Sequence, residues 1–219
     1  MADADVPSNI AAMRREYALK TLNESDVAAD PIEQFRRWFG EAQNAKLTEP
    51  NAMTVATADA SGRPSARIVL LKEFDARGFV FFTNYHSRKG RDLESNPRAC
   101  LNFFWDALER QVRIDGSVEK VSRQESETYF HIRPREAQIG AWVSHQGETI
   151  SSREELDRRY AELEKKFGDG EIPIPDYWGG YRVSPNAIEF WQGRPSRLHD
   201  RILYTLDKLG AWKISRLSP

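Results

Sequence analysis

Short strand-like segments joined by short turns constrain the fold of this chain more than any other feature of its sequence. Five such segments are expected between residues 52 and 121, at 53–58, 66–72, 78–83, 99–105 and 111–121, and four more at 181–183, 187–191, 198–204 and 211–215. Turn signals such as Ser61-Gly62 lie between them, which indicates hairpins rather than strand–helix–strand units. The pattern predicts a mainly β fold with peripheral helices (α+β), built on an antiparallel barrel that is closed or split.

Two of these segments have features of their own. The run 66–72 is almost continuously apolar between Arg67 and Lys72, which predicts a buried strand. Asp115-Gly116 indicates either a turn or a bulge within the segment 111–121. A turn is also expected at 75–78.

Helices are expected around the strands. Asp30 and Pro31 begin a helix whose apolar residues recur at helical spacing, and further helices are expected at 122–132, 134–144 and 152–167. Residues 1–29 predict a flexible arm with one short helical stretch around 10–22, and on composition alone they are a solvated tail. The pairs expected to form capping boxes are Asp30 with Glu33, Ser122 with Glu125, and Ser152 with Glu155.

Composition excludes several classes of protein. With 40% hydrophobic and 30% charged residues, the chain can bury a core, so wholesale disorder is excluded. The 32 Lys and Arg residues against 33 Asp and Glu leave a net charge of −1, and no nucleic-acid partner is expected. Apolar runs such as 79–82 are too short to cross a membrane, and the polar N-terminus does not resemble a secretory signal. We therefore expect one cytoplasmic domain over 1–219.

Several common catalytic motifs are missing from the sequence. The single cysteine, Cys100, excludes intrachain disulfides and cysteine-rich metal sites, and the four histidines are scattered, so no metal is expected. The sequence contains no Gly-x-Gly-x-x-Gly loop, no Walker A loop and no Gly-x-Ser-x-Gly elbow. Dinucleotide, nucleoside triphosphate and serine-hydrolase sites are therefore not indicated.

A cluster of cations follows the segment 78–83. Ser87 is a candidate helix N-cap, and residues 88–91 place three cations in the first turn, where each opposes the helix dipole by about 0.3–1 kcal/mol when exposed. A phosphate bound by these cations and by backbone N–H groups would offset that cost. The alternative is a basic surface patch paired with Asp92 and Glu94.

A second group of cations follows Trp191. If the chain resumes as a strand after the turn at 193–196, then Arg197, His199 and Arg201 alternate onto one face. They would repel one another there unless they were solvated or bound to an anion. A ligand pocket beside Trp191 and an exposed edge strand protected by charge are both open.

Two further pairs of residues are candidates for binding anionic groups. Arg67 and Lys72 bracket an apolar strand and, unless a bulge intervenes, point to opposite faces; the alternative is that both reach solvent at the barrel rims. Tyr129 and Arg133 are four residues apart on one expected helix face, where they would clamp a phosphate or stack on each other. Together with many aromatic residues, these sites favour an aromatic ligand that carries phosphate, and flavin mononucleotide (FMN) is the economical candidate.

A set of longer motifs points in the same direction. The most specific is Arg197-Leu198-His199-Asp200-Arg201 after Glu189-Phe190-Trp191-Gln192-Gly193. The others are Arg67 to Lys72, Phe82-Thr83-Asn84, Ser87-Arg88-Lys89, Glu109-Arg110-Gln111-Val112, Arg133-Pro134-Arg135, Gln138-Ile139-Gly140-Ala141, Trp178-Gly179-Gly180 and Arg216-Leu217-Ser218-Pro219. From about Arg14 to Pro219 the sequence resembles the pyridoxine/pyridoxamine 5′-phosphate oxidase family.

The resemblance implies an FMN-binding split β-barrel of Greek-key type and a homodimer with FMN at the subunit interface. It implies that FMN is bound by Arg67, Ile68, Val69, Leu70, Leu71, Lys72, Phe82, Thr83, Arg88, Lys89, Gln111, Gln146, Gly147, Trp191 and Arg201. It implies that substrate is bound by Arg14, Tyr17, Lys72, Tyr129, Arg133, Ala137, Arg197, Leu198 and His199. Arg197 and His199 would be the catalytic pair over the substrate ring, and the arm 1–29 would close over the substrate as a lid.

The family reaction oxidises C4′ of pyridoxine 5′-phosphate or pyridoxamine 5′-phosphate. A hydride passes to N5 of FMN, and O2 reoxidises the flavin with release of H2O2. The product is pyridoxal 5′-phosphate, with NH3 released from the amine substrate. The resemblance therefore implies an enzyme of vitamin B6 metabolism, with a phosphorylated small molecule and O2 as its partners.

The sequence departs from the family pattern at three implied site residues. Ala137 stands where the family usually has a serine that donates to the substrate phosphate, Gly147 also replaces a serine, and Phe82 stands where tyrosine is common. A hydrogen bond to a charged group contributes about 1.5–3 kcal/mol, so the departure at 137 predicts weaker substrate binding unless water or Arg135 substitutes.

Two other functions are considered beside the oxidase. One is a non-catalytic split-barrel protein that carries FMN or pyridoxal phosphate, which the alanine at 137 leaves open. The other is a flavin reductase with a nicotinamide donor, against which the block 197–201 argues.

Overall fold

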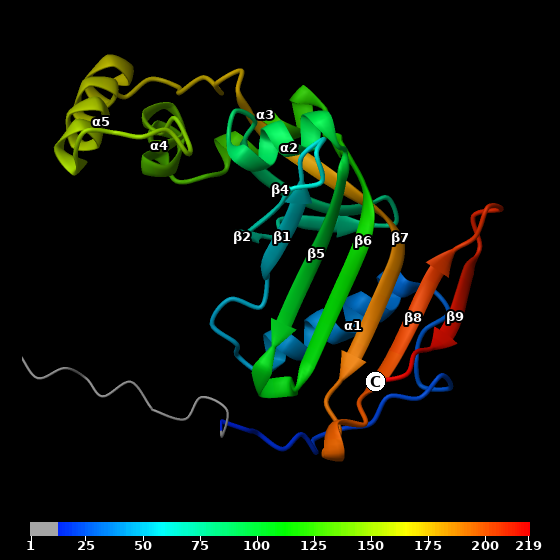
Figure 1. Ribbon diagram of the computed structural model, residues 1–219. Coiled ribbons are helices and arrows are strands. Elements are labelled where there is room, and N and C mark those ends of the chain that lie inside the picture. The colour runs from blue at the N-terminus through cyan, green and yellow to red at the C-terminus, as the bar shows by residue number, and fades with distance from the viewer. Residues whose placement is uncertain (1–12) are drawn as a thin grey trace, which may run out of the picture.

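The computed structural model describes residues 13–219, which form a curled sheet with helices around it (Figure 1). The helices are α1 (Pro31–Asn44), α2 (Arg88–Ser95), α3 (Arg123–His131), α4 (Arg135–Val143) and α5 (Arg153–Phe167), with short 3-10 turns at Asp106–Leu108 and Pro195–Arg197. The strands are β1 (Ala52–Ala58), β2 (Pro64–Leu70), β3 (Glu73–Asp75), β4 (Gly78–Asn84), β5 (Arg98–Trp105), β6 (Arg110–Lys120), β7 (Trp178–Gln192), β8 (Asp200–Leu206) and β9 (Trp212–Arg216). Between residues 13 and 219, no helix is long and apolar enough to span a membrane.

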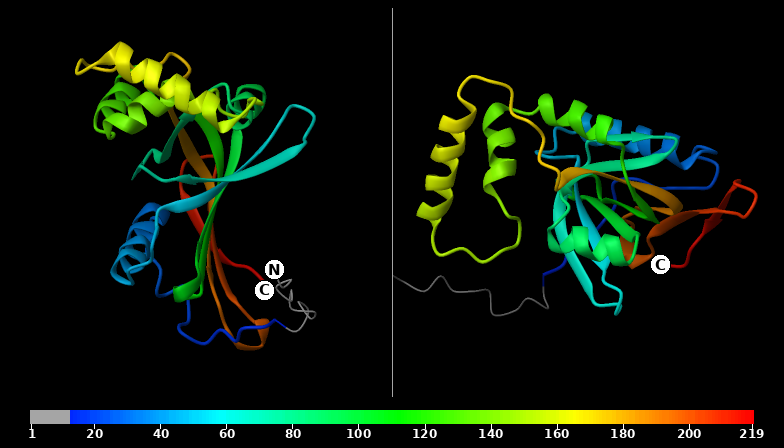
Figure 2. Two further views of the ribbon diagram at one scale, coloured as in Figure 1. Left: turned by 90° about the vertical axis from the view of Figure 1, so that its left-hand side faces the viewer. Right: turned by 90° about the horizontal axis from the view of Figure 1, so that it is seen from above.

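The sheet is antiparallel throughout its described pairs and follows the order β2-β1-β5-β6-β7-β4-β3, with β8 and β9 joined at β7. The first half of β7 pairs with β4 and its second half pairs with β8, while β6 runs along its other side. The sheet curls around this shared strand into a half-barrel (Figure 2). The predicted mainly β fold with an antiparallel barrel and peripheral helices is therefore confirmed.

Strand β7 is one strand of 15 residues, where two were predicted at 181–183 and 187–191. Pro185, which lies between the two predicted segments, is accommodated inside it. The pairing of β7 with β6 shifts register between Asp115 and Gly116, which pair with Ala187 and Pro185 and leave Asn186 of β7 as the extra residue; a bulge of this kind tolerates a proline in a sheet. Asp115-Gly116 is therefore a bulge and not a turn.

The main core lies between the sheet and α1. Asp30 caps α1, since its carboxylate accepts hydrogen bonds from the N–H groups of Ile32 and Glu33 at 2.7 and 3.1 Å. Phe35 is fully buried and meets Phe79 edge to face with ring centroids 4.9 Å apart. Burying such a side chain contributes about 1.5–3 kcal/mol, so this cap and stripe hold α1 on the sheet.

A second, smaller core lies under α3 and α4. Phe130, Ile139 and Trp178 are buried in it. The capping box predicted for α3 is present, with Ser122 and Glu125 bonded reciprocally. Figure 2 shows α4 and α5 as a pair beside the sheet, and this second core connects that pair to the start of β7.

Several local predictions are wrong. The expected buried strand 66–72 is the edge strand β2, which ends at Leu70 and leaves Ile68 65% exposed because no described element covers that face. A short strand, β3, lies just before the turn expected at 75–78. Residues 13–22 form no helix, and 10–12 lie outside the described residues. At α5, Ser152 is the N-cap residue as expected, but its side chain makes no capping hydrogen bond, and Glu155 accepts from Ser151 instead.

Candidate active site

The first part of the candidate site is a cavity of about 480 Å³ at the Trp178 end of β7, which we call the anion pocket. It is formed where β4 ends, where α3 and α4 follow each other, and where β7 begins. Its lining residues are Leu70, Lys72, Phe82, Thr83, Asn84, Tyr129, Arg133, Ala137, Gly140, Ala141, Ser144, Gln146 and Trp178. Eight of them, from four separate stretches of sequence, were predicted site residues.

Arg133 gives the anion pocket its charge. Its guanidinium lies 4.7 Å from the centroid of the Trp178 ring, and its Nη1 atom is buried without a hydrogen-bond partner among the described residues. Burial lowers the pKa of Arg133, with the opposing effect of Tyr129 smaller. A buried guanidinium nitrogen without a partner is costly, and a bound anion would satisfy it.

The rest of this pocket is aromatic. Phe82, Tyr129 and Trp178 form a cluster of nearly parallel rings, with centroids of Phe82 4.0 Å from Tyr129 and 5.5 Å from Trp178, and with Tyr129 6.2 Å from Trp178. Lys72 lies at the rim with Nζ 5.9 Å from the Tyr129 ring. Lys72 follows the end of β2, so it does not bracket the strand with Arg67 as expected. Tyr129 and Arg133 do line one pocket, although α3 ends at His131 and they do not share a helix face.

A cation cluster borders the anion pocket where α2 begins. Lys89 is 6% exposed, and its Nζ donates hydrogen bonds to Thr83 Oγ1 at 2.9 Å and to Gln146 Oε1 at 2.8 Å. Burial, with a smaller effect of Arg67, lowers the pKa of Lys89 to about 8. Ser87 caps α2 as predicted, since its Oγ accepts from the Gly90 N–H.

Asp92 is the carboxylate that faces this cluster. It lies 4.0 Å from Arg67 and accepts hydrogen bonds from Thr57 and Ser65, each at 2.6 Å. Burial raises the pKa of Asp92, but these two hydrogen bonds and the nearby arginines outweigh it and keep the pKa below its usual value. Asp92 is thus buried beside Arg67 and forms none of the ion pairs with the cations at 88–91 that the surface-patch alternative expected. One carboxylate does not balance the three cations at 67, 88 and 89.

The second part of the candidate site is a cavity of about 600 Å³ beyond the other end of β7, which we call the arm pocket. It lies between the N-terminal arm and the turn after Gln192. Its lining residues are Met13, Arg14, Arg15, Glu16, Tyr17, Arg194, Ser196, Arg197 and His199. Four of these were predicted site residues.

The turn that carries Arg197 and His199 is not the strand that was predicted. β8 begins only at Asp200, so Arg197, His199 and Arg201 do not share a strand face. Ser196 and Arg197 have φ values of +57° and +61°. This left-handed conformation costs a non-glycine residue about 1–2 kcal/mol, and such strain is concentrated at functional sites.

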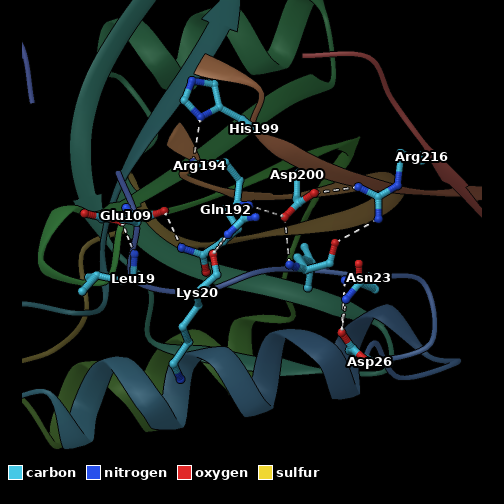
Figure 3. A network of polar contacts seen from close by, with 12 residues as sticks. Leu19, Lys20, Asn23, Asp26, Glu109, Gln192, Arg194, His199, Asp200 and Arg216 are labelled. Atoms are coloured by element: carbon cyan, nitrogen blue, oxygen red, sulfur yellow. Dashed lines mark hydrogen bonds and ion pairs between the residues drawn. The ribbon is translucent and has the colours of Figure 1, made fainter. Parts of the chain in front are cut away.

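The position of the ring proton of His199 follows from one contact. The backbone N–H of Arg194 donates to Nδ1 of His199 at 3.1 Å (Figure 3). Nδ1 must therefore be unprotonated, and the neutral imidazole carries its proton on Nε2. Burial, and secondly Arg197, lower the pKa of His199 and favour this neutral form. The imidazole is thus a hydrogen-bond donor through Nε2, and its ring lies 4.6 Å from Trp191.

The anion pocket and the arm pocket do not meet within one chain. One contains Trp178, the first residue of β7, and the other contains Arg194, two residues beyond its end. An extended strand of 15 residues spans roughly 45 Å. A ligand the size of a pyridine phosphate therefore cannot touch both pockets of one chain.

Some predicted site residues lie in neither pocket. These are Arg67, Ile68, Val69, Leu71, Arg88, Lys89, Gln111, Gly147, Trp191, Leu198 and Arg201. Arg201 is bonded to Glu189 at 2.7 Å, and Leu198 is 69% exposed. Prediction from the sequence missed Asn84 and Ser144 in the anion pocket and Arg194 in the arm pocket. Asn84 directly follows the predicted Thr83, and Arg194 lies between the predicted Trp191 and Arg197, so position along the chain was the signal that could have found these two.

No group of three or more His, Cys, Asp or Glu residues within 13–219 is arranged to hold a metal ion.

Fold and pockets together define a split-barrel protein with a cationic, aromatic ligand site. Two solved structures share this architecture. PhzG from Burkholderia lata, in complex with tetrahydrophenazine-1-carboxylic acid, is 31% identical with a TM-score of 0.86 and matches over 92% of this chain and 100% of its own. A pyridoxamine 5′-phosphate oxidase-related, FMN binding protein from Nostoc punctiforme has a TM-score of 0.70 at 15% identity over 88% of this chain and 100% of its own, which supports the fold.

Comparison of sequences identifies the family. Residues 39–167 match the family model of pyridoxamine 5′-phosphate oxidase, and 178–219 match that of the pyridoxine 5′-phosphate oxidase C-terminal dimerisation region. The pyridoxine/pyridoxamine 5′-phosphate oxidase of Trichormus variabilis is 59% identical over 96% of this chain and 98% of its own. That of Cupriavidus pinatubonensis is 58% identical over 97% of this chain and 100% of its own. The chain belongs to the pyridoxine/pyridoxamine 5′-phosphate oxidase family.

Proposed function

We propose that this chain is an FMN-dependent oxidase that converts pyridoxine 5′-phosphate or pyridoxamine 5′-phosphate to pyridoxal 5′-phosphate with O2 as electron acceptor. The observation that carries the proposal is the buried Nη1 atom of Arg133, which has no partner among the described residues and borders an aromatic pocket. A phosphorylated aromatic ring suits both features. The names of the relatives supply the particular substrates.

The cation cluster at α2 suits the phosphate of FMN. A buried lysine with a lowered pKa beside Arg67 is stabilised when an anion arrives. We assign FMN binding to the residues that the resemblance implies, with Arg67, Arg88 and Lys89 on the phosphate. When bound, FMN would accept a hydride from C4′ of the substrate at N5 and pass the electrons to O2, giving H2O2. The chain's own part is orientation and electrostatics.

The substrate is proposed to bind through its two ends. Lys72, Tyr129 and Arg133 hold its phosphate in the anion pocket, where Ala137 supplies no hydroxyl. Arg197 and the Nε2–H group of His199 orient its ring, with Leu198 beside them. Arg14 and Tyr17, from the arm 1–29, close over it as a lid and exclude water.

Such a site requires two copies of the chain. Because the anion pocket and the arm pocket lie at opposite ends of β7, we propose a homodimer in which Arg197 and His199 of one subunit serve the anion pocket of the other. The match of 178–219 to a dimerisation region supports this arrangement. So does the exposure of Ile68 and Phe104, at 65% and 55%, on strands of the sheet. We further propose that each subunit is a single domain and that the enzyme works in the cytoplasm.

Two other functions give different outcomes in the same experiment. A non-catalytic carrier would bind FMN without reacting, and a reductase would accept electrons from a nicotinamide donor. The likeness to PhzG adds tetrahydrophenazine-1-carboxylic acid as a ligand to test.

The test is anaerobic addition of pyridoxine 5′-phosphate to the FMN-loaded protein while the flavin absorbance is followed. We expect the flavin band to bleach, and to return with H2O2 when O2 is admitted. A bound flavin that stays oxidised at high substrate would contradict the oxidase. Bleaching by NADH alone would instead support the reductase, and bleaching by the phenazine alone would support a PhzG-like activity.

A further inference from the structure

Glu109 stands at the tight turn between β5 and β6, where it lies next to the N-terminal arm. It follows the 3-10 turn Asp106–Leu108 and has a left-handed backbone, with φ of +56°. Its side chain is 4% exposed, although the turn itself is at the surface. A buried carboxylate is retained only where its oxygens are bonded, so its partners indicate its role.

The partners of the Glu109 carboxylate belong to the arm. Oε2 accepts hydrogen bonds from the backbone N–H groups of Ala18 at 2.9 Å and Leu19 at 3.0 Å (Figure 3). Oε1 lies 3.7 Å from the guanidinium of Arg15. One side chain therefore binds three residues of the arm, Arg15, Ala18 and Leu19, within the stretch 13–22 that forms no helix.

The backbone of Glu109 is bonded on the other side to the turn that carries His199. Its carbonyl oxygen accepts from the Gly193 N–H at 2.7 Å and from Nε2 of Gln192 at 3.1 Å. The ring of Tyr17 packs directly against Gly193. A residue with a side chain would not fit there, because its Cβ atom would lie 2.7 Å from the ring. Glu109 thus joins the arm to the arm pocket.

Asp200 binds the arm a few residues further along. Its carboxylate accepts from the Leu22 N–H at 3.0 Å and pairs with Arg216 at 2.7 Å and Arg194 at 3.3 Å (Figure 3). The segment between Ala18 and Leu22 is therefore held at one end by Glu109, from the β5–β6 turn, and at the other by Asp200, from the start of β8. Tyr17, immediately before this segment, packs edge to face on Trp191 and His199, with centroids 5.7 and 5.8 Å apart.

We infer that Glu109 is a positioning residue for substrate binding: its carboxylate fixes the arm at Ala18 and Leu19 so that Tyr17 packs over Gly193 and His199. The expected effect of Glu109 on substrate binding rests on the proposed function. The expected effect on the conformation of the arm does not depend on that function. The carboxylate does not line the arm pocket, so it acts through the arm and not on the substrate.

The direct test is amide hydrogen exchange of the FMN-loaded, full-length protein with Glu109→Gln and Glu109→Ala. We expect peptides covering 16–22 to exchange at least tenfold faster in Glu109→Ala, and less so in Glu109→Gln, which keeps one acceptor oxygen. Peptides from α1 and β7 should be unchanged. Glu119→Gln, an exposed position on β6, the strand that follows Glu109, is the matched control. Unchanged exchange over 16–22 in Glu109→Ala would overturn the inference, whether or not the protein is active.

The kinetic test separates positioning from general damage. We expect Glu109→Gln to raise KM for pyridoxine 5′-phosphate about tenfold, with kcat changed less than threefold and FMN affinity unchanged. In a Tyr17→Ala background the same substitution should have little further effect, because both act through the arm. Additive effects in the double variant, or a loss confined to kcat or FMN affinity, would contradict the inference. If Glu109→Ala does not fold, Glu109→Gln alone and combined with Tyr17→Ala still test the inference.

Discussion

The anion pocket and the arm pocket are built from different structural material. The anion pocket is formed by strand ends and helices over a buried aromatic core, and its buried Arg133 nitrogen lacks a partner among the described residues. The arm pocket is formed by a segment without regular structure and a strained turn, held by carboxylates. Its lining residue Arg194 is paired with Asp200, which also pairs with Arg216 outside the pocket.

The difference indicates a division of labour. A pocket whose cation is unpaired and rigidly mounted is prepared to bind an anion, because the side chain needs no reorganisation. A pocket held by polar contacts to an irregular segment opens at lower cost than one built on a packed core. The anion pocket should therefore determine affinity, and the arm pocket should determine access and orientation.

The largest expected effect is that of Arg133→Met. Losing a charged hydrogen bond to the substrate phosphate costs about 1.5–3 kcal/mol, so kcat/KM for pyridoxine 5′-phosphate should fall about 10- to 150-fold. Thermal stability should not fall, because a buried unsatisfied nitrogen is removed. Arg135→Met is the matched control, since Arg135 bonds the carbonyl of Gly170 on the outer surface. An unchanged kcat/KM would mean that the anion pocket does not bind the phosphate.

Ala137→Ser should act in the opposite direction. Ala137 lines the anion pocket on α4, and a hydroxyl there can donate to the substrate phosphate. We expect KM for pyridoxine 5′-phosphate to fall about tenfold, at the lower end of a charged hydrogen bond. Ala161→Ser on the exposed face of α5 is the control. A rise in KM would show that the hydroxyl does not face the phosphate.

The lowered pKa of Lys89 predicts that stability and anion binding depend on pH in opposite directions. The pKa of its ammonium group is about 8 in the folded protein, against 10.5 for an unperturbed lysine. Between these values the unfolded state carries more protons, so the free energy of unfolding of the FMN-free protein should rise with pH from about 8 to 10.5. FMN affinity should fall several-fold over the same range as the ammonium is lost. Urea unfolding measures the free energy of unfolding and calorimetric titration measures FMN affinity, with Lys89→Met as a reference that lacks this titration. If stability and FMN affinity changed in the same direction with pH, the assignment of Lys89 to the phosphate of FMN would be contradicted.

The smallest expected effect is that of Ser196→Gly in the arm pocket. Glycine accepts the left-handed conformation of this residue without strain, while it increases the entropy of the unfolded chain. We expect a net stabilisation of under about 1 kcal/mol by chemical unfolding. Ser117→Gly, in the extended backbone of β6, should instead destabilise by about 0.5–1 kcal/mol. Equal destabilisation by both would mean that the turn is not strained.

Local chemistry made parts of the site predictable. Ser87 caps α2 and Asp30 caps α1, as their sequences indicate, because a cap depends on residues within one turn. The excess of cations after Ser87 was likewise visible in the sequence. What could not be predicted was that Lys89 is buried against Thr83 and Gln146, since Gln146 lies 57 positions away.

The errors have a common physical origin. Pro185 stays within β7 because β7 bulges at the next residue where it pairs with β6, and Ile68 is exposed because nothing described covers the edge strand β2. Arg197 and His199 lie on a turn because the Arg194 N–H bonds the imidazole instead of a neighbouring strand. Each outcome depends on a partner distant in sequence or in another layer of the fold, which local patterns do not encode.

The sequence by itself determined the mainly β architecture, the helix starts and the residue types that suit a phosphorylated aromatic ligand, because periodicity, capping and charge act over a few residues. Only the tertiary structure decided that these residues form two pockets at opposite ends of β7, and that Glu109 and Asp200 hold the arm beside one of them. The physical reason is that burial, an unsatisfied guanidinium and a carboxylate bonded to a remote backbone arise only when the sheet brings distant segments together.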